Sequence, residues 1–365
     1  MIKQLTVKNF RIFDEKTVDF QPGVNVILGK NGVGKTSLLE AIYFTSFTKS
    51  FKAPQDIDMV KQDADFFQIA STWVESKYTN TQANYLKNKG KRFIFDEETI
   101  TRMIDIIGSF PLVFQSPEDF RVTAGPSSER RSYFDRFISQ ISSAYLQDLI
   151  TYRRLLKNRN AHLKQLSERK DYIYTAQLQV YDQQLSPIMY GIMNTRRSYS
   201  ELFNKHLDEL YSSTFEDGSM GNIVYKPSLL AETEADFQIV HQEQTQNNIE
   251  KEIILRRTLW GPNYDKYLFL RNGEPLIHYA SQGEHKIWMT MLKLAEGAII
   301  TGLQGIEPIY LLDDLFAELD INNSKRITEK IMKAKQVLIS TTDMSDLRRH
   351  GIDAEKDNIN IIEIS

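Results

Sequence analysis

Apolar and polar side chains alternate over the first part of the chain, and this pattern predicts β-strands. Two strands are expected at Leu5 to Phe10 and Lys16 to Phe20, joined by a polar turn. Further alternation predicts strands at 66–74 and 92–95. The polar run Lys77 to Lys91 between them predicts a hairpin or an exposed loop.

The pattern changes to a helical period from Glu129 to about Leu210. One long amphipathic helix is marked by apolar residues on a single face, namely Tyr145, Leu149, Tyr152, Leu156 and Leu163. A second helical segment begins at about Tyr172, and Pro187 should break or kink it. A short strand at Ile223 to Tyr225 and a helix at 234–257 are expected after it.

The last hundred residues return to strands that alternate with helices. Tyr267 to Ile277 predicts a hairpin around an Asn-Gly turn, and Lys286 to Ile300 predicts a helix. The apolar runs Pro308 to Asp314 and Val337 to Asp343 predict buried parallel strands, with a helix at Asn322 to Ala334 between them. The pattern as a whole indicates an α/β fold.

One segment carries a complete phosphate-binding pattern. Gly29 to Thr36 matches G-x-x-x-x-G-K-[ST], with an apolar run before it and helical spacing after it. Strand, glycine loop and helix let backbone amides surround phosphate oxygens, while Lys35 reaches the β- and γ-phosphates and Thr36 holds Mg²⁺. The alternative is a simple glycine-rich turn. The predicted nucleotide-binding residues here are Gly29, Lys30, Asn31, Gly32, Val33, Gly34, Lys35, Thr36 and Ser37.

Two carboxylates end the first buried strand of the last hundred residues. In a P-loop ATPase, Asp313 would complete the Mg²⁺ shell that Thr36 begins, and Asp314 would polarise the attacking water. Asp is one methylene shorter than Glu, which predicts slow hydrolysis suited to a switch. A buried strand that ends in Asp is also compatible with a turn alone. The chemistry requires both segments in one sheet, so the sequence predicts an ATPase lobe of 1–118 and 255–365 and a mainly helical insertion lobe of 119–254.

The chain is slightly acidic overall, with a formal net charge of -3, so contact with nucleic acid requires a local basic surface. Between Arg121 and Lys170 there are eleven Lys or Arg residues against four Asp or Glu. A solvated helix face is one explanation, although such faces usually carry paired acids. The predicted DNA-phosphate contacts are Arg130, Arg131, Arg153, Arg154, Lys157 and Arg159.

The composition also bears on the compartment. The absence of cysteine excludes a disulfide framework and any Cys-based zinc site. Met1 leads directly into a strand pattern, and no apolar run reaches the roughly 18 residues of a membrane span. We therefore expect a soluble cytoplasmic protein without a membrane partner.

Several segments, in one order over nearly the whole chain, resemble the RecF family of recombinational repair ATPases, which is related to the SMC and Rad50 proteins. They are Asn9-Phe10-Arg11, Gly29 to Thr36, Ser116 to Asp119, Ser128 to Arg131 with Phe134 to Arg136, Tyr152 to Asn160, Gly261-Pro262, Ser281 to Glu284, Leu312 to Asp314 with Glu318 to Asp320, and Thr341 to Asp343. The resemblance implies an ABC/SMC-type ATPase head with an inserted helical lobe. Two stretches depart from the family pattern, Ser50-Phe51-Lys52 and Asn263-Tyr264.

The resemblance also implies roles for particular residues. Ser281-Gln282-Gly283 would be the signature motif, which reaches across a dimer to the γ-phosphate of ATP bound by the other subunit. Ser281 is equally a good helix N-cap, with Glu284 three residues later. Leu319-Asp320 would be the D-loop, and Gln115 a Q-loop residue. Arg11 would approach the nucleotide, whereas a turn arginine is otherwise usually a solvated charge.

The function implied is a weak, DNA-dependent ATPase in DNA replication and recombinational repair. ATP and Mg²⁺ would hold two subunits together on single-stranded, gapped or junction DNA, and slow hydrolysis would release them. RecR and RecO are the implied partners, and gap repair, recombinase loading and SOS induction the implied processes. Three alternatives are an SMC or Rad50 head, which needs a far longer coiled coil, a transporter ATPase subunit, and a scaffold switched by ATP without useful hydrolysis.

Overall fold

Five parallel strands form the sheet that carries the phosphate loop. The computed structural model describes residues 1–314, 321–352 and 359–365, with the backbone alone for 321–324. The sheet order is β14 (Asn360–Glu363), β3 (Gly23–Leu28), β13 (Gln336–Thr341), β12 (Ile309–Asp313) and β8 (Leu112–Gln115). The register pairs Leu28 with Thr341, Asp313 with Ser340 and Leu312 with Gln115, so the carboxyl ends of four strands share one edge. This edge is where parallel sheets bind ligands.

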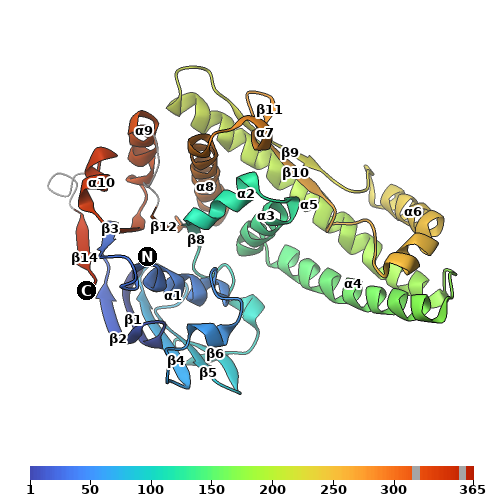
Figure 1. The fold of residues 1–365 in the computed structure, drawn as a ribbon, viewed down its shortest axis with the longest axis horizontal. Coiled ribbons are helices and arrows are strands. Elements are labelled where there is room, and N and C mark those ends of the chain that lie inside the picture. Colours follow the sequence, from blue (N-terminus) through green and yellow to red (C-terminus); the bar gives the residue numbers. More distant parts are fainter. Residues whose placement is uncertain (315–320, 353–358) are drawn as a thin grey trace.

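A second, antiparallel sheet lies on the other side of helix α1 (Lys35–Phe47). Its order is β2 (Phe13–Asp19), β1 (Ile2–Phe10), β4 (Phe66–Trp73), β5 (Asn80–Leu86), β6 (Gly90–Phe95) and β7 (Glu98–Ile100). Helix α1 contacts strands of both sheets (Figure 1), and eleven of its thirteen residues are buried. Its apolar side chains therefore join the two sheets into one core.

Strand β5 lies inside the polar run Lys77 to Lys91 and forms a hairpin with β6, so the predicted hairpin is present and the alternative of an exposed loop is wrong. The two fully buried positions are Thr81 and Ala83, which have little of the hydrophobicity that marks a strand, while partly buried Tyr85 on the same face stacks on Phe67. Thr81 is buried because its hydroxyl bonds to Ser71 Oγ at 2.8 Å and accepts from Trp73 Nε1 at 3.0 Å. Hydrogen bonding thus replaces apolar burial at Thr81.

Helices form an arm that extends away from the two sheets (Figure 1). After the 3₁₀ turns at Asp56–Met59, Met103–Asp105 and Pro117–Asp119, the arm contains α2 (Phe120–Ala124), α3 (Ser127–Ile141), α4 (Ser143–Arg169), α5 (Ala176–Thr214) and α6 (Glu234–Leu255). Helix α5 continues through Pro187, so the predicted break was wrong. Along its length α5 packs against α4, α6 and α8 (Gln282–Gln304).

A small sheet connects the arm to the later part of the chain. Its order is β11 (Glu274–Pro275), β10 (Lys266–Arg271) and β9 (Gly221–Lys226), and the β10–β11 turn is the predicted Asn-Gly turn. The predicted lobe boundary at 254/255 therefore falls between two strands of one sheet.

The remaining helices follow the last hundred residues in chain order. They are α7 (Leu276–Tyr279), α8, α9 (Ile321–Ile331) and α10 (Met344–Arg349). The strands and helices predicted in this segment are all present, although their bounds shift by a few residues. Among the described residues, no helix is long and apolar enough to cross a membrane.

Candidate nucleotide site

The loop between β3 and α1 is shaped by its glycines and by Lys35. Gly34 has φ 100°, and a Cβ there would lie 2.4 Å from the ring of Phe13. Only glycine meets both requirements. The ammonium group of Lys35 folds back over the loop and donates to the carbonyl oxygens of Gly29 at 2.7 Å and Lys30 at 2.9 Å. These bonds hold Lys35 at the place where phosphate oxygens would replace the carbonyl oxygens.

Thr36 and Asp313 meet at the carboxyl edge of the parallel sheet, as predicted. The Thr36 hydroxyl lies 3.0 Å from Oδ1 and 2.9 Å from Oδ2 of Asp313. The Ser340 hydroxyl, on the neighbouring strand β13, donates to Asp313 Oδ1 at 2.5 Å. A hydroxyl and a buried carboxylate beside a phosphate loop are a donor set that suits Mg²⁺, which prefers oxygen ligands and shares them with phosphates. The residues present therefore fit the metal.

Asp314 follows directly in a left-handed backbone conformation, with φ 50°. Its amide donates to the Ser340 carbonyl at 3.3 Å and to the Ser340 hydroxyl at 3.2 Å, which anchors the turn. The side chain is exposed. Burial lowers the pKa of Lys35, and the carboxylates of Asp314 and Asp313 act in the opposite direction. The lysine and both aspartates thus belong to one electrostatic site.

Gln115 ends β8 and lines a pocket with Asp313 and Asp314. His285 and Lys286, from the first turns of α8, line the same pocket. It therefore joins the strand edge to the helix that follows the signature-like segment.

Ser281, Gln282 and Gly283 lie at the N-terminus of α8. Ser281 is the N-cap, and a capping box joins it to Glu284, whose amide donates to the Ser281 hydroxyl at 3.3 Å. Ser281 and Gln282 are exposed. The geometry accounts for the helix cap and leaves the side chains of this segment on the surface.

Arg11 packs against α1. It donates to both carboxylate oxygens of Glu40, at 2.7 and 2.5 Å, and to the carbonyl of Asp58 at 2.8 Å. Glu40 is buried and also accepts from the Ser50 hydroxyl. Arg11 is therefore not the freely solvated charge of a turn. Its approach to nucleotide remains a prediction.

Leu319 and Asp320 lie outside the described residues. The D-loop role that the resemblance implies for them remains a prediction.

The basic segment 121–170 is only partly a surface. Arg153, Arg154 and Lys157 are exposed on α4. Arg159 is 0% exposed and pairs with Asp182 at 2.6 Å and Glu252 at 2.7 Å. Its predicted contact with DNA phosphates was wrong, because a fully buried guanidinium reaches no phosphate.

Arg130 and Arg131 are also committed to contacts within the chain. Arg130 is buried and donates to the carbonyl oxygens of Val122 at 3.4 Å and Gly125 at 3.0 Å. Arg131 donates to the carbonyl of Asp265 at 2.9 Å. The predicted contact of Arg130 with DNA was therefore wrong on the same ground of burial, whereas half-buried Arg131 stays a prediction.

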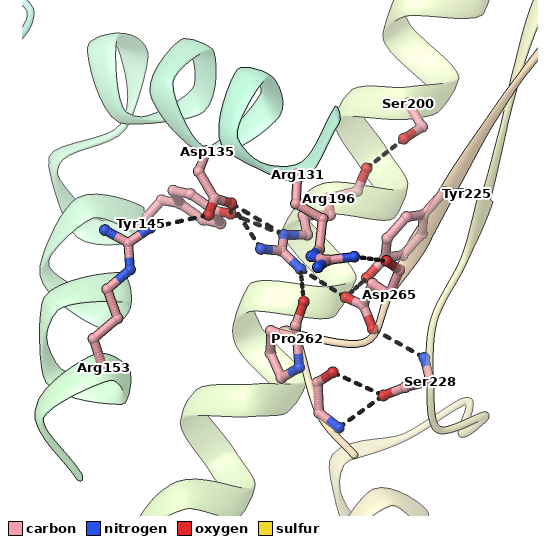
Figure 2. Close-up of polar contacts among 11 residues, drawn as sticks. Arg131, Asp135, Tyr145, Arg153, Arg196, Ser200, Tyr225, Ser228, Pro262 and Asp265 are labelled. Carbon is pink, nitrogen blue, oxygen red and sulfur yellow. Dashed lines mark hydrogen bonds and ion pairs between the residues drawn. The ribbon is translucent and has the colours of Figure 1, made fainter. Parts of the chain in front are cut away.

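A buried polar network at the base of the helical arm was missed from the sequence. Arg196 of α5 donates to Asp135 of α3 at 2.7 Å and to Asp265, just before β10, at 2.7 Å. Figure 2 shows both carboxylates directed at this guanidinium. Tyr225 of β9 donates to Asp265 at 2.5 Å, and Tyr145 of α4 donates to Asp135 at 2.6 Å. The network ties three helices to strand β9 and to the residue that precedes β10.

The sequence did contain a signal for this network. Asp265 lies in the same stretch as the departures Asn263 and Tyr264, and Pro262 supplies a carbonyl to Arg196 at 2.7 Å. A stretch that departs from the family pattern still contains the acid and the backbone carbonyl that the network needs.

Comparisons with known proteins identify the family to which the chain belongs. A family profile described as an AAA domain matches residues 4–362. The chain is 32% identical to the DNA replication and repair protein RecF of Chloroherpeton thalassium, over 96% of this chain and 97% of that protein. It is 31% identical to the RecF protein of Oceanobacillus iheyensis, with 96% of each covered.

Solved structures with a similar fold are also known. The structure of the recombination mediator protein RecF-ATPrS in the RecFOR pathway superposes with a TM-score of 0.86 at 28% identity, and covers 95% of this chain and 93% of that one. An Smc head domain bound to the C-terminal domain of ScpA, from Pyrococcus furiosus, superposes with a TM-score of 0.51 at 17% identity over 95% and 91% of the chains. The latter shows the fold alone. The chain therefore belongs to the RecF family of DNA replication and repair proteins and has the P-loop ATPase head fold that this family shares with Smc.

Proposed function

We propose that this protein is an ATP-dependent dimerisation switch that acts on single-stranded or gapped DNA. The observation that supports this most directly is the contact of the Thr36 hydroxyl with both carboxylate oxygens of Asp313, beside Lys35 and Asp314. These residues come from opposite ends of the chain, and a phosphate loop with a carboxylate at this edge is the arrangement of an NTPase. The relative solved as RecF-ATP is consistent with ATP as the nucleotide.

In this site each residue has one task. Lys35 neutralises the β- and γ-phosphates, and Thr36 with Asp313 would hold Mg²⁺, which would neutralise charge on the transferred phosphoryl group. Asp314 accepts a proton from the attacking water and orients it. Because the carboxylate of Asp is held one methylene nearer to the backbone than that of Glu, we expect slow turnover.

The second subunit would complete the site. Ser281, Gln282 and Gly283 are on the surface and face solvent at a helix N-terminus, where backbone amides favour an anion. In the proposed dimer they reach the γ-phosphate of the partner, so ATP joins the subunits and hydrolysis separates them. DNA would bind through phosphates to the exposed basic residues of α4, with RecR and RecO as further partners and with roles in gap repair, recombinase loading and SOS induction.

Sedimentation of the full chain with Mg-ATP and a short gapped duplex, compared with the same run in ADP, tests this proposal. We expect a dimer and a DNA complex with ATP only. Lys35→Ala should abolish nucleotide binding and dimerisation together, because the phosphates lose their principal cation. Lys89→Ala, an exposed lysine in the β5–β6 turn, is the matched control and should behave like the wild type.

Asp314→Asn separates binding from hydrolysis in the same experiment. The variant keeps the shape of the side chain but cannot accept a proton, so it should form ATP-dependent dimers that persist. A wild-type chain that stays monomeric and ignores DNA in both nucleotides would refute the proposed switch. An Asp314→Asn variant that hydrolyses ATP at the wild-type rate would remove Asp314 from the mechanism alone.

A further inference from the structure

Thr290 connects helix α8 to the carboxyl edge of the parallel sheet. It is 1% exposed, and its Oγ1 donates to the Lys286 carbonyl, one turn earlier in α8, at 2.9 Å. The same oxygen accepts a hydrogen bond from Nε2 of Gln115 at 3.1 Å. Gln115 is the last residue of β8 and pairs with Leu312, directly before Asp313. A chain of contacts thus runs from Thr290 through Gln115 to the strand that ends in Asp313, the carboxylate proposed to hold the metal.

The hydroxyl of Thr290 determines which way the Gln115 amide turns. A hydroxyl has one proton, and here that proton is committed to the Lys286 carbonyl. Oγ1 can then only accept, so it selects the NH₂ side of the amide and directs Oε1 of Gln115 elsewhere. The orientation of the glutamine is therefore imposed by its neighbour.

Oε1 of Gln115 is buried and has no hydrogen-bond partner among the described residues. A buried carbonyl oxygen without a partner costs free energy, so such atoms call for an explanation. Gln115 lines the pocket that Asp313 and Asp314 also line. Turned into that pocket, the amide oxygen would be a ligand or hydrogen-bond acceptor suited to a hydrated Mg²⁺ ion.

We propose that Thr290 is a positioning residue that holds Gln115 so that Oε1 faces the hydrated Mg²⁺ of bound nucleotide. The inference rests on the proposed function, since it needs Mg-ATP at the phosphate loop. It adds a residue of α8 to the site. That helix, whose N-cap is Ser281, thereby gains a direct link to the metal within one subunit. A change in the metal's coordination would thereby be transmitted to the helix that carries the surface for the second subunit.

Two variants of Thr290 test this role. Thr290→Val keeps the shape of the side chain but removes the acceptor, and Thr290→Ser keeps the hydroxyl. Mn²⁺ affinity of the ATP-bound full chain, measured by electron paramagnetic resonance, should fall about tenfold in Thr290→Val, as for other residues that orient metal ligands. Thr290→Ser should restore it, and ATP affinity without metal should stay unchanged in both.

Thr301→Val is the matched control. Thr301 is in the same helix and its hydroxyl likewise donates to the carbonyl four residues earlier, that of Gly297, at 2.9 Å. This variant should keep wild-type Mn²⁺ affinity. In a Gln115→Ala background, Thr290→Val should have no further effect, because the group that it positions is gone.

The outcomes are distinguishable. Unchanged Mn²⁺ affinity in a Thr290→Val chain that binds ATP would overturn this inference and leave the proposed function intact. If Thr290→Val does not fold, the Gln115→Ala variant decides: wild-type Mn²⁺ affinity there overturns the inference. A wild-type chain that binds no ATP would overturn the proposed function first.

Discussion

His241, in α6, is a buried histidine without a charge. Its Nε2 has no hydrogen-bond partner among the described residues, and its ring stacks on Phe237. Burial lowers the pKa of His241 to about 4, with Asp182 acting against the shift and Arg159 acting with it. The folded protein therefore holds the neutral imidazole at neutral pH.

This pKa makes the stability of the chain depend on pH in a defined window. The unfolded histidine binds a proton below its ordinary pKa of 6.5, whereas the folded one does so only near pH 4. The stabilisation is thus complete above pH 6.5 and is lost as the pH falls toward 4. Between pH 7 and pH 5 it should amount to about 2 kcal/mol in the free energy of unfolding.

Denaturant titrations at pH 7 and pH 5 measure this effect. Replacing His241 by Asn removes the titrating group, so the loss between the two pH values should shrink by about 2 kcal/mol. His206→Asn, a partly exposed histidine of α5, should leave the wild-type loss intact. An equal loss in His241→Asn and wild type would assign the acid sensitivity to other groups.

Among single residues, the sequence correctly predicted that Thr36 and Asp313 meet, and it wrongly predicted an exposed position for Arg159. The first two lie in patterns whose chemistry requires them to meet. Arg159 was counted by its charge, although its spacing from Leu156 and Leu163 places it within the apolar stripe of α4. Helical periodicity was therefore the signal that could have identified it as a buried group.

The exposed basic face of α4 is the element proposed to contact DNA. Arg153 also pairs with Asp135 at 3.3 Å, so it contributes to the buried network as well. Arg154 and Lys157 are three residues apart on the same helix face and are exposed. They test the DNA contact without disturbing the network.

Reversing both charges, with Arg154→Glu and Lys157→Glu, should weaken binding of gapped DNA and flatten its salt dependence. Each lost phosphate contact reduces the slope of log K against log salt by about 1. Fluorescence anisotropy across a salt series measures both quantities. The control is Lys205→Glu with Lys251→Glu, exposed residues of α5 and α6. A slope unchanged by the α4 pair would move the DNA site to another element.

Helices and strands were predicted well where their own residues are apolar or periodic, and poorly where contacts with neighbouring helices and strands decide the structure. The buried strands β3, β12 and β13 are continuous apolar runs, so their sequence alone identifies them. Strand β5 depends on its neighbours β4 and β6, and α5, which packs along α4, α6 and α8, continues through Pro187. Neither feature is visible along a single stretch of residues.

For the whole molecule, the network around Arg196 is a buried polar link between the helical arm and the last part of the chain. Asp265 is fully buried and accepts from Arg196, Tyr225 and the amide of Ser228. Asp135 balances the same guanidinium from the other side (Figure 2). Removing one acid leaves a buried positive charge only half compensated.

Asp265→Asn should therefore destabilise the protein by about 3 kcal/mol, the cost of breaking a buried ion pair from one side. Asp208→Asn, an exposed acid of α5, should change stability by less than about 0.5 kcal/mol. Equilibrium unfolding in urea measures both variants. Equal stability of the two would mean that the arm is held by apolar packing alone.

The order of strands in the parallel sheet also determines at what point of its own synthesis the protein can bring Thr36 and Asp313 together. Strand β3 reaches β12 only through β13, which ends at Thr341. A nascent chain displays its phosphate loop early, yet the ribosome must add some 300 more residues before Asp313 can be held beside Thr36. At elongation rates of about 5–20 residues per second, that interval lasts roughly 15 to 60 seconds. Messages cut short before the codons for β13 would yield fragments in which Thr36 and Asp313, the two proposed metal ligands, remain apart.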